Sequence, residues 1–318
     1  MQRRQFAKIA ATAGAAAITM GSRAFGAEAK DLSDGKPFKA KFYPNFGQFR
    51  ASTKGMSLVD KIKFFYDCGF RGIEDNGMAG RPVEEQVAIG KQLEKLGMEM
   101  GVFCASIDWN CARLPGNRME ADIRKFPPDP KAVREVIKQR MEAALEIAKR
   151  VNAKWCTVVP GLEDPTLETE YQFANVVDNL RYASEICERT GLIMVLEPLN
   201  IKNHPNLYLK RVPQAYAICR AVNSPCCKIL DDLYHQQVTE GNLIPNIDAA
   251  WSEIAYIQVG DVPGRKEPTT GEINYKKIFQ HLWDKGYRGV IGMEHGQSDT
   301  TIEGDKKLIE AYRSVDVA

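Results

Sequence analysis

Short apolar segments alternate with longer amphipathic segments along most of the chain. Nearly continuous apolar runs are typical of parallel strands covered on both faces, and the longer segments carry apolar residues at helical spacing. Several of the longer segments stop at a glycine, a common signal for the end of a helix. The pattern predicts strands at 39–43, 72–75, 100–105, 155–159, 193–198, 228–233, 255–261 and 289–295, and helices at roughly 57–68, 82–97, 130–150, 168–190, 211–222, 242–251, 275–285 and 302–314.

This succession of strand–helix units predicts an α/β fold, a single-domain (β/α)8 TIM barrel. A doubly wound open sheet is the alternative, but neither a G-x-G-x-x-G motif nor a P-loop follows the first strand. A weak internal echo favours a repeated unit, because 65–75 and 282–294 share aromatic-Asp-x-Gly-aromatic-Arg-Gly-aliphatic. Segment 107–129 predicts a long loop after the third strand, and we expect this loop, with Trp109, to cover the barrel mouth.

The N-terminal segment does not share this alternation. Arg3 and Arg4 precede an apolar stretch over 9–20, and the letters AEA at 27–29 offer a cleavage site. This arrangement resembles a twin-arginine export signal, and its apolar stretch is shorter than the ~20 residues of a membrane-spanning helix. We therefore predict a signal peptide over 1–29, the barrel domain over 30–318, periplasmic localisation and no membrane anchor.

Charge and cysteine usage narrow the classes of partner. The 318-residue chain has a formal net charge of +2, and removing the four basic residues and one acidic residue of 1–29 leaves −1 for 30–318. Such a domain is not suited to nucleic acids or to anionic membrane surfaces. The eight cysteines form no C-x-x-C pair, and an oxidising compartment would permit a disulfide without indicating its partners.

Four consecutive predicted strands lead into a polar side chain that can bind a metal. These side chains are Glu197 in VLEPLN, Asp231 or Asp232 in ILDDLYH, Gln258 in YIQVGD and Glu294 in IGMEHG. Each gap between them is about one strand–helix unit long, so the four side chains are expected at one end of neighbouring strands. Catalytic groups of a TIM barrel lie at that end, although each residue alone could be a solvated strand end.

Three carboxylates at one barrel mouth raise each other's pKa and cannot all stay ionised without a cation. A divalent metal removes this conflict. Carboxylate and amide oxygens suit a hard ion, and the cofactor predicted for Glu197, Asp231 or Asp232, Gln258 and Glu294 is therefore Mg²⁺ or Mn²⁺.

At this point the residues resemble the hydroxypyruvate isomerase family, within the xylose-isomerase-like TIM barrels of sugar isomerases and epimerases. The resemblance covers roughly 38–315 and is most specific in 257–275, IQVGDVPGRKEPTTGEINY. It implies an aldose–ketose isomerisation of hydroxypyruvate and tartronate semialdehyde through an enediol. The implied metal ligands are Glu197, Asp232, Gln258 and Glu294, with Glu197 and Glu294 also acting as acid and base.

Further positions bear on the substrate, which the resemblance implies to be a hydroxy-keto acid or a sugar. Arg265 is the best candidate to bind a substrate carboxylate, and the resemblance gives His235 a hydrogen bond to a substrate oxygen. A solvated loop arginine and a histidine that tethers the following helix are the plain alternatives. His295 departs from the aromatic residue common in the family, and Arg50 could be another anion contact.

Other functions remain open from the sequence. A ketose 3-epimerase or another sugar enzyme on the same scaffold would keep the metal and both glutamates. An AP-endonuclease-like barrel would need a histidine-rich site, and the chain has four histidines. A periplasmic binding protein would need no catalytic carboxylates. Homo-oligomerisation is possible. Strand alternation sends Asp231 and Asp232 to opposite faces, so we expect Asp231 to point toward the helices or solvent.

Overall fold

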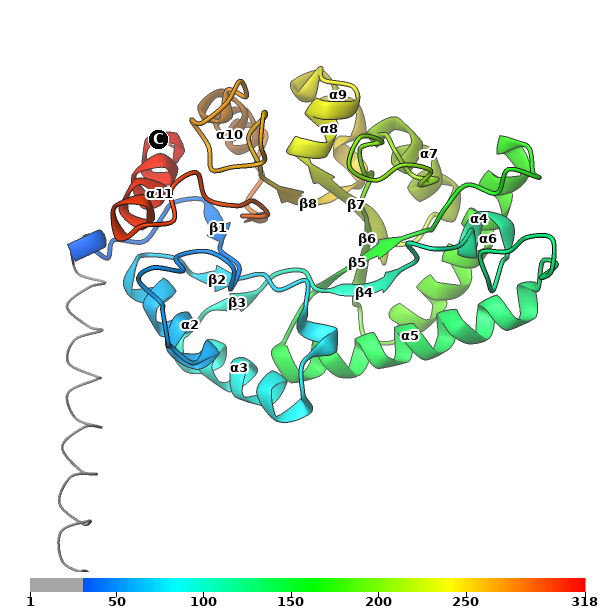
Figure 1. Ribbon diagram of the computed structural model, residues 1–318, viewed down its shortest axis with the longest axis horizontal. Helices are drawn as coiled ribbons and strands as arrows, with labels where there is room; N and C mark the ends of the chain where they lie inside the picture. Colours follow the sequence, from blue (N-terminus) through cyan, green and yellow to red (C-terminus); the bar gives the residue numbers. More distant parts are fainter. Residues whose placement is uncertain (1–30, 318) are drawn as a thin grey trace, which may run out of the picture.

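The computed structural model describes residues 31–317, and their strands curl into a parallel α/β barrel (Figure 1). One sheet has the order β1-β9-β8-β7-β6-β5-β4, and β2 pairs with β3. The strands are β1 (Lys41–Tyr43), β2 (Gly72–Ile73), β3 (Glu99–Met100), β4 (Cys104–Ile107), β5 (Trp155–Val159), β6 (Ile193–Leu196), β7 (Cys227–Asp232), β8 (Ile254–Gln258) and β9 (Val290–Gly292).

Hydrogen bonds, and a bridge between Met100 and Ala153, connect the two sheets at their edges. The Glu74 amide donates to the Pro44 carbonyl over 3.0 Å and joins β2 to β1. The Thr157 amide donates to the Phe103 carbonyl over 2.8 Å and joins β5 to the segment between β3 and β4. The predicted third strand, 100–105, is therefore interrupted and appears as β3 and β4. The other seven predicted strands and the TIM barrel are confirmed.

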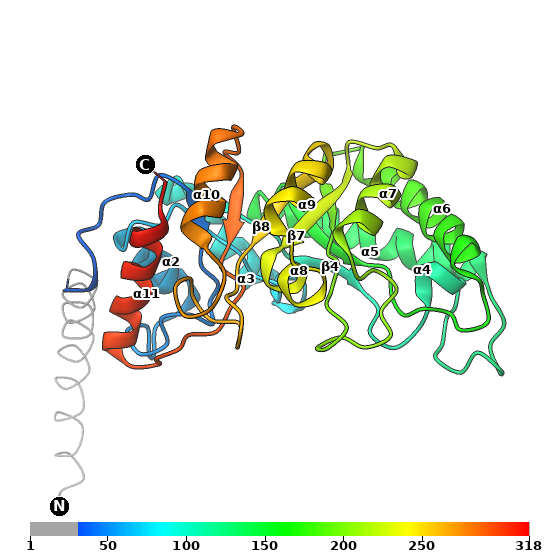
Figure 2. The ribbon, with the colours of Figure 1, turned by 90° about the horizontal axis from the view of Figure 1, so that it is seen from above.

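Helices surround the strands, as the two perpendicular views show (Figures 1 and 2). All eight predicted helices are present, and the structure adds two short ones, α4 and α8, together with two 3-10 turns. The helices are α2 (Leu58–Asp67), α3 (Val83–Leu96), α4 (Arg113–Gly116), α5 (Pro130–Val151), α6 (Thr169–Cys187), α7 (Val212–Val222), α8 (Leu233–Thr239), α9 (Leu243–Ala250), α10 (Tyr275–Asp284) and α11 (Ile302–Val315), and the turns are η1 (Met78–Gly80) and η2 (Trp251–Glu253).

The side chains inside the barrel are apolar in the layer that comes before the carboxyl ends of the strands. Val195, Leu230, Tyr256 and Val290, on four neighbouring strands, are completely buried in one cluster. Each such side chain stabilises the fold by roughly 1.5–3 kcal/mol through burial. Because side chains alternate along a strand, the residues two or four positions later point to the same interior. Those positions hold the four polar residues of the candidate site.

A β-bulge determines the register between two of these strands, β7 and β8. Ile229 of β7 pairs with Ile254 of β8, but the next residue, Leu230, pairs with Tyr256. Ala255 is the extra residue. The shift carries through to the strand ends, where Asp232 pairs with Gln258. Bulges of this kind re-aim side chains next to active sites.

No helix within 31–317 is long and apolar enough to cross a bilayer. The predicted export signal lies outside the described residues, so export to the periplasm stays a prediction. All eight cysteines lie within the described residues and are free. Segment 107–129 is irregular except for α4, in agreement with the predicted loop.

Gly90 gives a test of helix packing around the barrel. A Cβ at Gly90 in α3 would lie 2.0 Å from the carbonyl oxygen of Arg150 in α5. Helix propensity alone would favour Gly90→Ala by up to about 1 kcal/mol, but overlap of two backbones costs roughly 1–3 kcal/mol. We therefore expect Gly90→Ala to lower the free energy of unfolding, measured by urea denaturation.

The matched control is Gly80→Ala, where no atom lies within 4 Å of the added Cβ. It should change the free energy of unfolding by less than about 0.5 kcal/mol. A Gly90→Ala variant as stable as the native chain would show that α3 and α5 do not depend on this close approach.

Candidate active site

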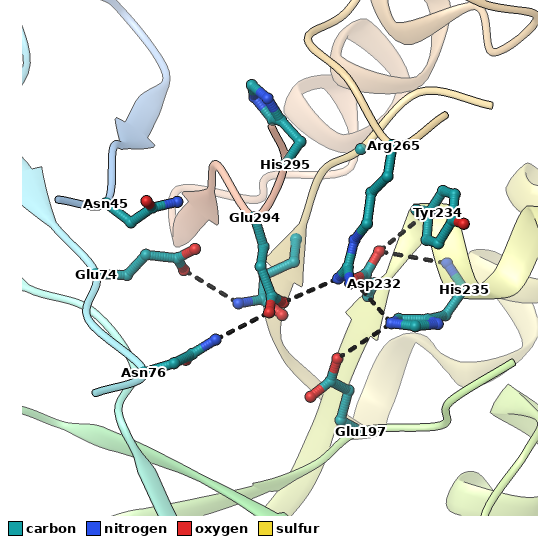
Figure 3. A network of polar contacts seen from close by, with 12 residues as sticks. Asn45, Glu74, Asn76, Glu197, Asp232, Tyr234, His235, Arg265, Glu294 and His295 are labelled. Carbon is teal, nitrogen blue, oxygen red and sulfur yellow. Dashed lines mark hydrogen bonds and ion pairs between the residues drawn. The ribbon is translucent and has the colours of Figure 1, made fainter. Parts of the chain in front are cut away.

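Polar side chains from neighbouring strands converge at the carboxyl end of the barrel (Figure 3). Glu197 follows β6, Asp232 ends β7, Gln258 ends β8, and Glu294 lies two residues after β9. Asp232 and Gln258 are almost completely buried, and Glu197 is 7% exposed. The structure thus brings the four predicted metal ligands to one end of neighbouring strands.

Asp232 has a defined role on each of its two oxygens. Its Oδ1 accepts hydrogen bonds from the amides of Tyr234 at 2.8 Å and His235 at 3.4 Å, which makes it the N-cap of α8. A carboxylate at a helix N-terminus is stabilised by the free amides there. Because Oδ1 is fixed in this way, Oδ2 faces the site.

Arg265 bridges two of the carboxylates. Its Nη2 atom lies 2.6 Å from Asp232 Oδ2 and 3.2 Å from Glu294 Oε2. The guanidinium also lies over the ring of Tyr234, 5.0 Å from its centroid. The positive φ of Gly264 (94°) and of Arg265 (52°) turns the loop after β8 back over the strand ends. The cation predicted to bind substrate therefore reaches the site.

The pKa values of the carboxyl groups differ because one arginine lies close to several of them. Burial, and then the charges of Glu294 and Asp232, raise the pKa of Glu197 well above its ordinary value. Burial and Asp232 raise the pKa of Glu294 to about 7, against the lowering effect of Arg265. The pKa of Asp232 is lowered because Arg265 and His235 outweigh its burial. A further cation would allow all three to ionise.

His235 is oriented by Asn200, with one ring nitrogen toward the site. The Asn200 backbone amide donates to its Nδ1 atom over 3.2 Å, and the Asn200 side-chain amide lies 2.7 Å from the same atom. Burial lowers the pKa of His235 to about 4, so the ring is neutral. With Nδ1 accepting, the proton lies on Nε2, which is 3.7 Å from Glu197 Oε1 and 3.6 Å from Asp232 Oδ2.

The donor set fits a hard divalent metal. Ligand atoms of Glu197, Asp232 and His235 lie within 4.8 Å of one another. Gln258 Oε1 is buried and accepts no hydrogen bond from the described residues, and Glu294 Oε2 is also buried, 3.2 Å from Arg265 Nη2. An unpaired buried acceptor costs about 1–3 kcal/mol, which a bound cation would offset. The Nε2 proton of His235 removes this ring from the cluster, which leaves Glu197 and Asp232. Gln258 and Glu294 add oxygens at the same end of the neighbouring strands.

Aromatic rings extend outward from His235 to the barrel mouth. His204 lies 5.5 Å from the His235 ring, and Trp109 stacks on His204 at 5.1 Å with an interplanar angle of 19°. Trp109 is 46% exposed. The loop 107–129 therefore reaches the rim of the site, as the sequence predicted.

A cavity of about 460 Å³ opens beside Glu294, on the side of β1 and β2. Its lining is mostly polar, and Asn76 Nδ2 donates to Glu294 Oε1 over 2.9 Å. Volumes of this order are typical of small-molecule sites. The lining includes Asn45, Phe46, Glu74, Asn76, Arg81 and Glu294.

Sequence reasoning missed Glu74 and Asn76. Glu74 follows β2, is 1% exposed, and accepts hydrogen bonds from Tyr256 Oη (3.1 Å) and Gln258 Nε2 (3.2 Å). Its signal was present, because the repeat 65–75 closes on a carboxylate just as 282–294 does. Aligned on that repeat, Glu74 matches Ile291 and not Glu294, so the repeat indicated a carboxylate after β2 without giving its position in the site.

Two residues considered for the substrate lie elsewhere. His295 points away from the cluster because it follows Glu294 on the opposite face (Figure 3), and its Nε2 lies 2.7 Å from Tyr312 Oη. Arg50 is exposed and donates from Nε to the Gly47 carbonyl over 2.9 Å. His295 therefore helps to hold β9 against α11.

Asp231 points away from the barrel interior, as strand alternation predicted, but it does not reach solvent. It is completely buried between the strands and the outer helices, and neither oxygen has a hydrogen-bond partner in the described residues. Of the two predicted surroundings, helices or solvent, the structure has the helices, because the helix layer closes over β7. Burial, and then Asp232, raise the pKa of Asp231 to about 8.

Comparisons of sequence place the chain among known isomerases. The family model described as xylose isomerase-like TIM barrel matches residues 62–314. The hydroxypyruvate isomerase of Escherichia coli (strain K12) is 29% identical over 252 residues, which span 77% of this chain and 90% of that protein. The 2-oxo-tetronate isomerase of Cupriavidus necator is 30% identical over 246 residues, spanning 75% and 87%.

Solved structures share the fold at lower identity. An AP endonuclease, family 2, from Brucella melitensis has a TM-score of 0.69 at 22% identity, covering 83% of this chain and 96% of its own. A D-psicose 3-epimerase, solved with D-fructose, has a TM-score of 0.64 at 17% identity, covering 86% and 96%. The IOLI protein, solved with a zinc atom, has a TM-score of 0.62 at 17% identity, covering 86% and 96%.

Asp231 gives a prediction for stability against pH. Its folded pKa of about 8 exceeds the ordinary 3.8, so between these values the unfolded chain ionises while the folded chain keeps the proton. Stability is therefore lost as pH rises from about 4 to 8. We expect Asp231→Asn to remove this loss and to gain about 1–3 kcal/mol over the native chain at pH 8.

The measurement is denaturant unfolding of the metal-free proteins at pH 5 and pH 8. Asp178→Asn, on the exposed face of α6, is the matched control and should show no pH-dependent gain. An Asp231→Asn variant that loses stability equally at both values would mean that Asp231 is ionised and paired in the folded chain.

Proposed function

The chain belongs to the xylose isomerase-like TIM barrel family, and we propose that it is a metal-dependent isomerase that interconverts hydroxypyruvate and tartronate semialdehyde through an enediol. The observation that carries the proposal is the convergence of Glu197 and Glu294 on the position of Asp232 and Arg265, from strands three apart in the ring. Two carboxyl groups on either side of one substrate position can exchange a proton between neighbouring carbons.

The metal would be held by Glu197, Asp232, Gln258 and Glu294, and the all-oxygen donor set favours Mg²⁺ or Mn²⁺. Bound there, it would polarise the substrate carbonyl as a Lewis acid. It would also offset the charges of the carboxylates that Arg265 contacts. The guanidinium would then be free to form a bidentate pair with the substrate carboxylate.

The chain's own groups account for the proton movements. One glutamate removes a proton from the hydroxymethyl carbon, and the other returns a proton to the neighbouring carbonyl carbon. The hydroxyl proton moves to the former carbonyl oxygen, so the atoms balance. The Nε2–H of His235 faces the same space and would donate to a substrate oxygen. Trp109, stacked on His204, would limit the access of water to the enediol.

A longer substrate is the second candidate. The cavity of about 460 Å³ beside Glu294 is larger than a three-carbon acid needs, and its polar lining suits hydroxyl groups. A relative at 30% identity is named 2-oxo-tetronate isomerase. A four-carbon keto acid or a free ketose could extend from Arg265 past Glu294 into this cavity, which would make the enzyme a sugar-acid isomerase or a 3-epimerase.

A substrate panel in deuterated water tests these proposals together. Hydroxypyruvate, 2-oxo-tetronate and D-fructose would each be incubated with the protein, and deuterium at carbon followed by NMR. We expect exchange into hydroxypyruvate, its loss after complete chelation, and its return with Mn²⁺ or Mg²⁺. Exchange into D-fructose alone would favour the epimerase, and activity that survives metal removal would exclude the metal's role.

Glu294→Gln tests the acid–base assignment. The amide cannot take up or return a proton, so we expect deuterium exchange to fall by roughly 10²–10⁴-fold. The measurement is made at saturating Mn²⁺, so that weaker metal binding does not explain the loss, and circular dichroism checks the fold. Glu272→Gln, an exposed carboxylate bonded to Gln237, is the control and should keep full exchange. Full exchange in Glu294→Gln would exclude Glu294 as acid or base.

A further inference from the structure

Glu74 lies in the candidate site without any role in the chemistry described above. We propose that Glu74 is a positioning residue that fixes the side-chain amide of Gln258, so that its oxygen and not its nitrogen faces the metal. This inference rests on the proposed function only in taking Gln258 as a metal ligand.

The contacts of Glu74 point to this role. Its Oε2 atom accepts hydrogen bonds from Gln258 Nε2 at 3.2 Å and from Tyr256 Oη at 3.1 Å. Both donors lie on the interior face of β8, two residues apart. Glu74 enters from β2, across the barrel from Glu197 and His235 (Figure 3). The Glu74 carboxyl group therefore contacts the last two inward-facing side chains of β8, a strand with which β2 does not pair.

The chemistry of an amide makes such an anchor necessary. A glutamine side chain has one oxygen that can bind a cation and one NH₂ group that cannot, and a half-turn exchanges them. Glu74 Oε2 accepts hydrogen bonds from both Gln258 Nε2 and Tyr256 Oη, so it favours the orientation that places the NH₂ group toward Glu74. Gln258 Oε1 is then left on the other side, and it is buried and accepts no hydrogen bond from the described residues.

The backbone around Glu74 leaves room for this arrangement. A Cβ at Gly292 in β9 would lie 1.9 Å from Glu74 Oε2 and 3.0 Å from Gln258 Cγ. A Cβ at Gly101 would lie 2.3 Å from Tyr256 Oη and 3.2 Å from Glu74 Cβ. Any larger residue at either position would displace the carboxylate or one of its donors. A glycine in β9 and a glycine directly after β3 thus leave space for the same contact.

Mn²⁺ affinity of the full-length, metal-free protein, measured by calorimetry, tests the inference without relying on turnover. Glu74→Gln keeps the shape of the side chain but lets the Gln258 amide turn. Glu74→Asp keeps the carboxyl group, but its shorter side chain holds the acceptor oxygen farther from Gln258. We expect each variant to weaken Mn²⁺ binding by about 10–100-fold, the usual effect of losing a partner that orients a metal ligand. Thermal unfolding checks the fold, and two variants keep the test open if one does not fold.

The control uses Gln258→Glu, whose two equivalent oxygens need no orientation. In that background Glu74→Gln should not weaken Mn²⁺ binding, and this non-additivity marks positioning rather than general damage. Equal loss in both backgrounds, or Glu74→Asp binding as tightly as the native chain, would overturn the inference while leaving the proposed function intact. A native chain that does not bind Mn²⁺ would overturn the metal site and this inference with it.

Discussion

The structure depends on holding several carboxylates together at one buried point. Glu74, Glu197, Asp232 and Glu294 converge there, and Arg265 is the cation that contacts two of them. Two like charges about 4 Å apart repel by roughly 4 kcal/mol at an effective dielectric constant of 20. No single contact offsets several repulsions of this size. The fold must therefore hold the carboxyl groups rigidly, and positive charge must be present at the site.

Rigidity comes from elements that would form whether or not a metal binds. The interior cluster of Val195, Leu230, Tyr256 and Val290 fixes the strands whose next inward positions are the polar ones. Asp232 is tied to the start of α8, and His235, on that same helix, is held by Asn200. These groups are thus held by apolar and backbone contacts in addition to the ion pairs of Arg265, so the site is pre-organised.

Most of the barrel and the four strand-end residues were predictable from the sequence because strand alternation and unit length are local properties. Glu74 was not singled out, since its partners lie on β8, far along the chain and across the barrel. Helix α8 was missed because Asp232 both ends β7 and caps the helix. No loop residues therefore separate the strand pattern from the helix pattern in the sequence. The burial of Asp231 was misjudged because it depends on how closely the outer helices cover β7. The cavity beside Glu294 is lined by residues from distant segments, so no local pattern encodes it.

The bulge at Ala255 has a consequence for how such a site could be moved to another protein. If the same residues continued in a regular ladder from the pair of Ile229 and Ile254, Asp232 would pair with Ile257, whose side chain lies on the other face of β8. The four oxygen donors would then be present in the sequence but out of register in space. The geometry of such a candidate site depends partly on the number of residues along a strand. Grafting only its side chains onto a regular barrel would therefore transfer its composition without its geometry.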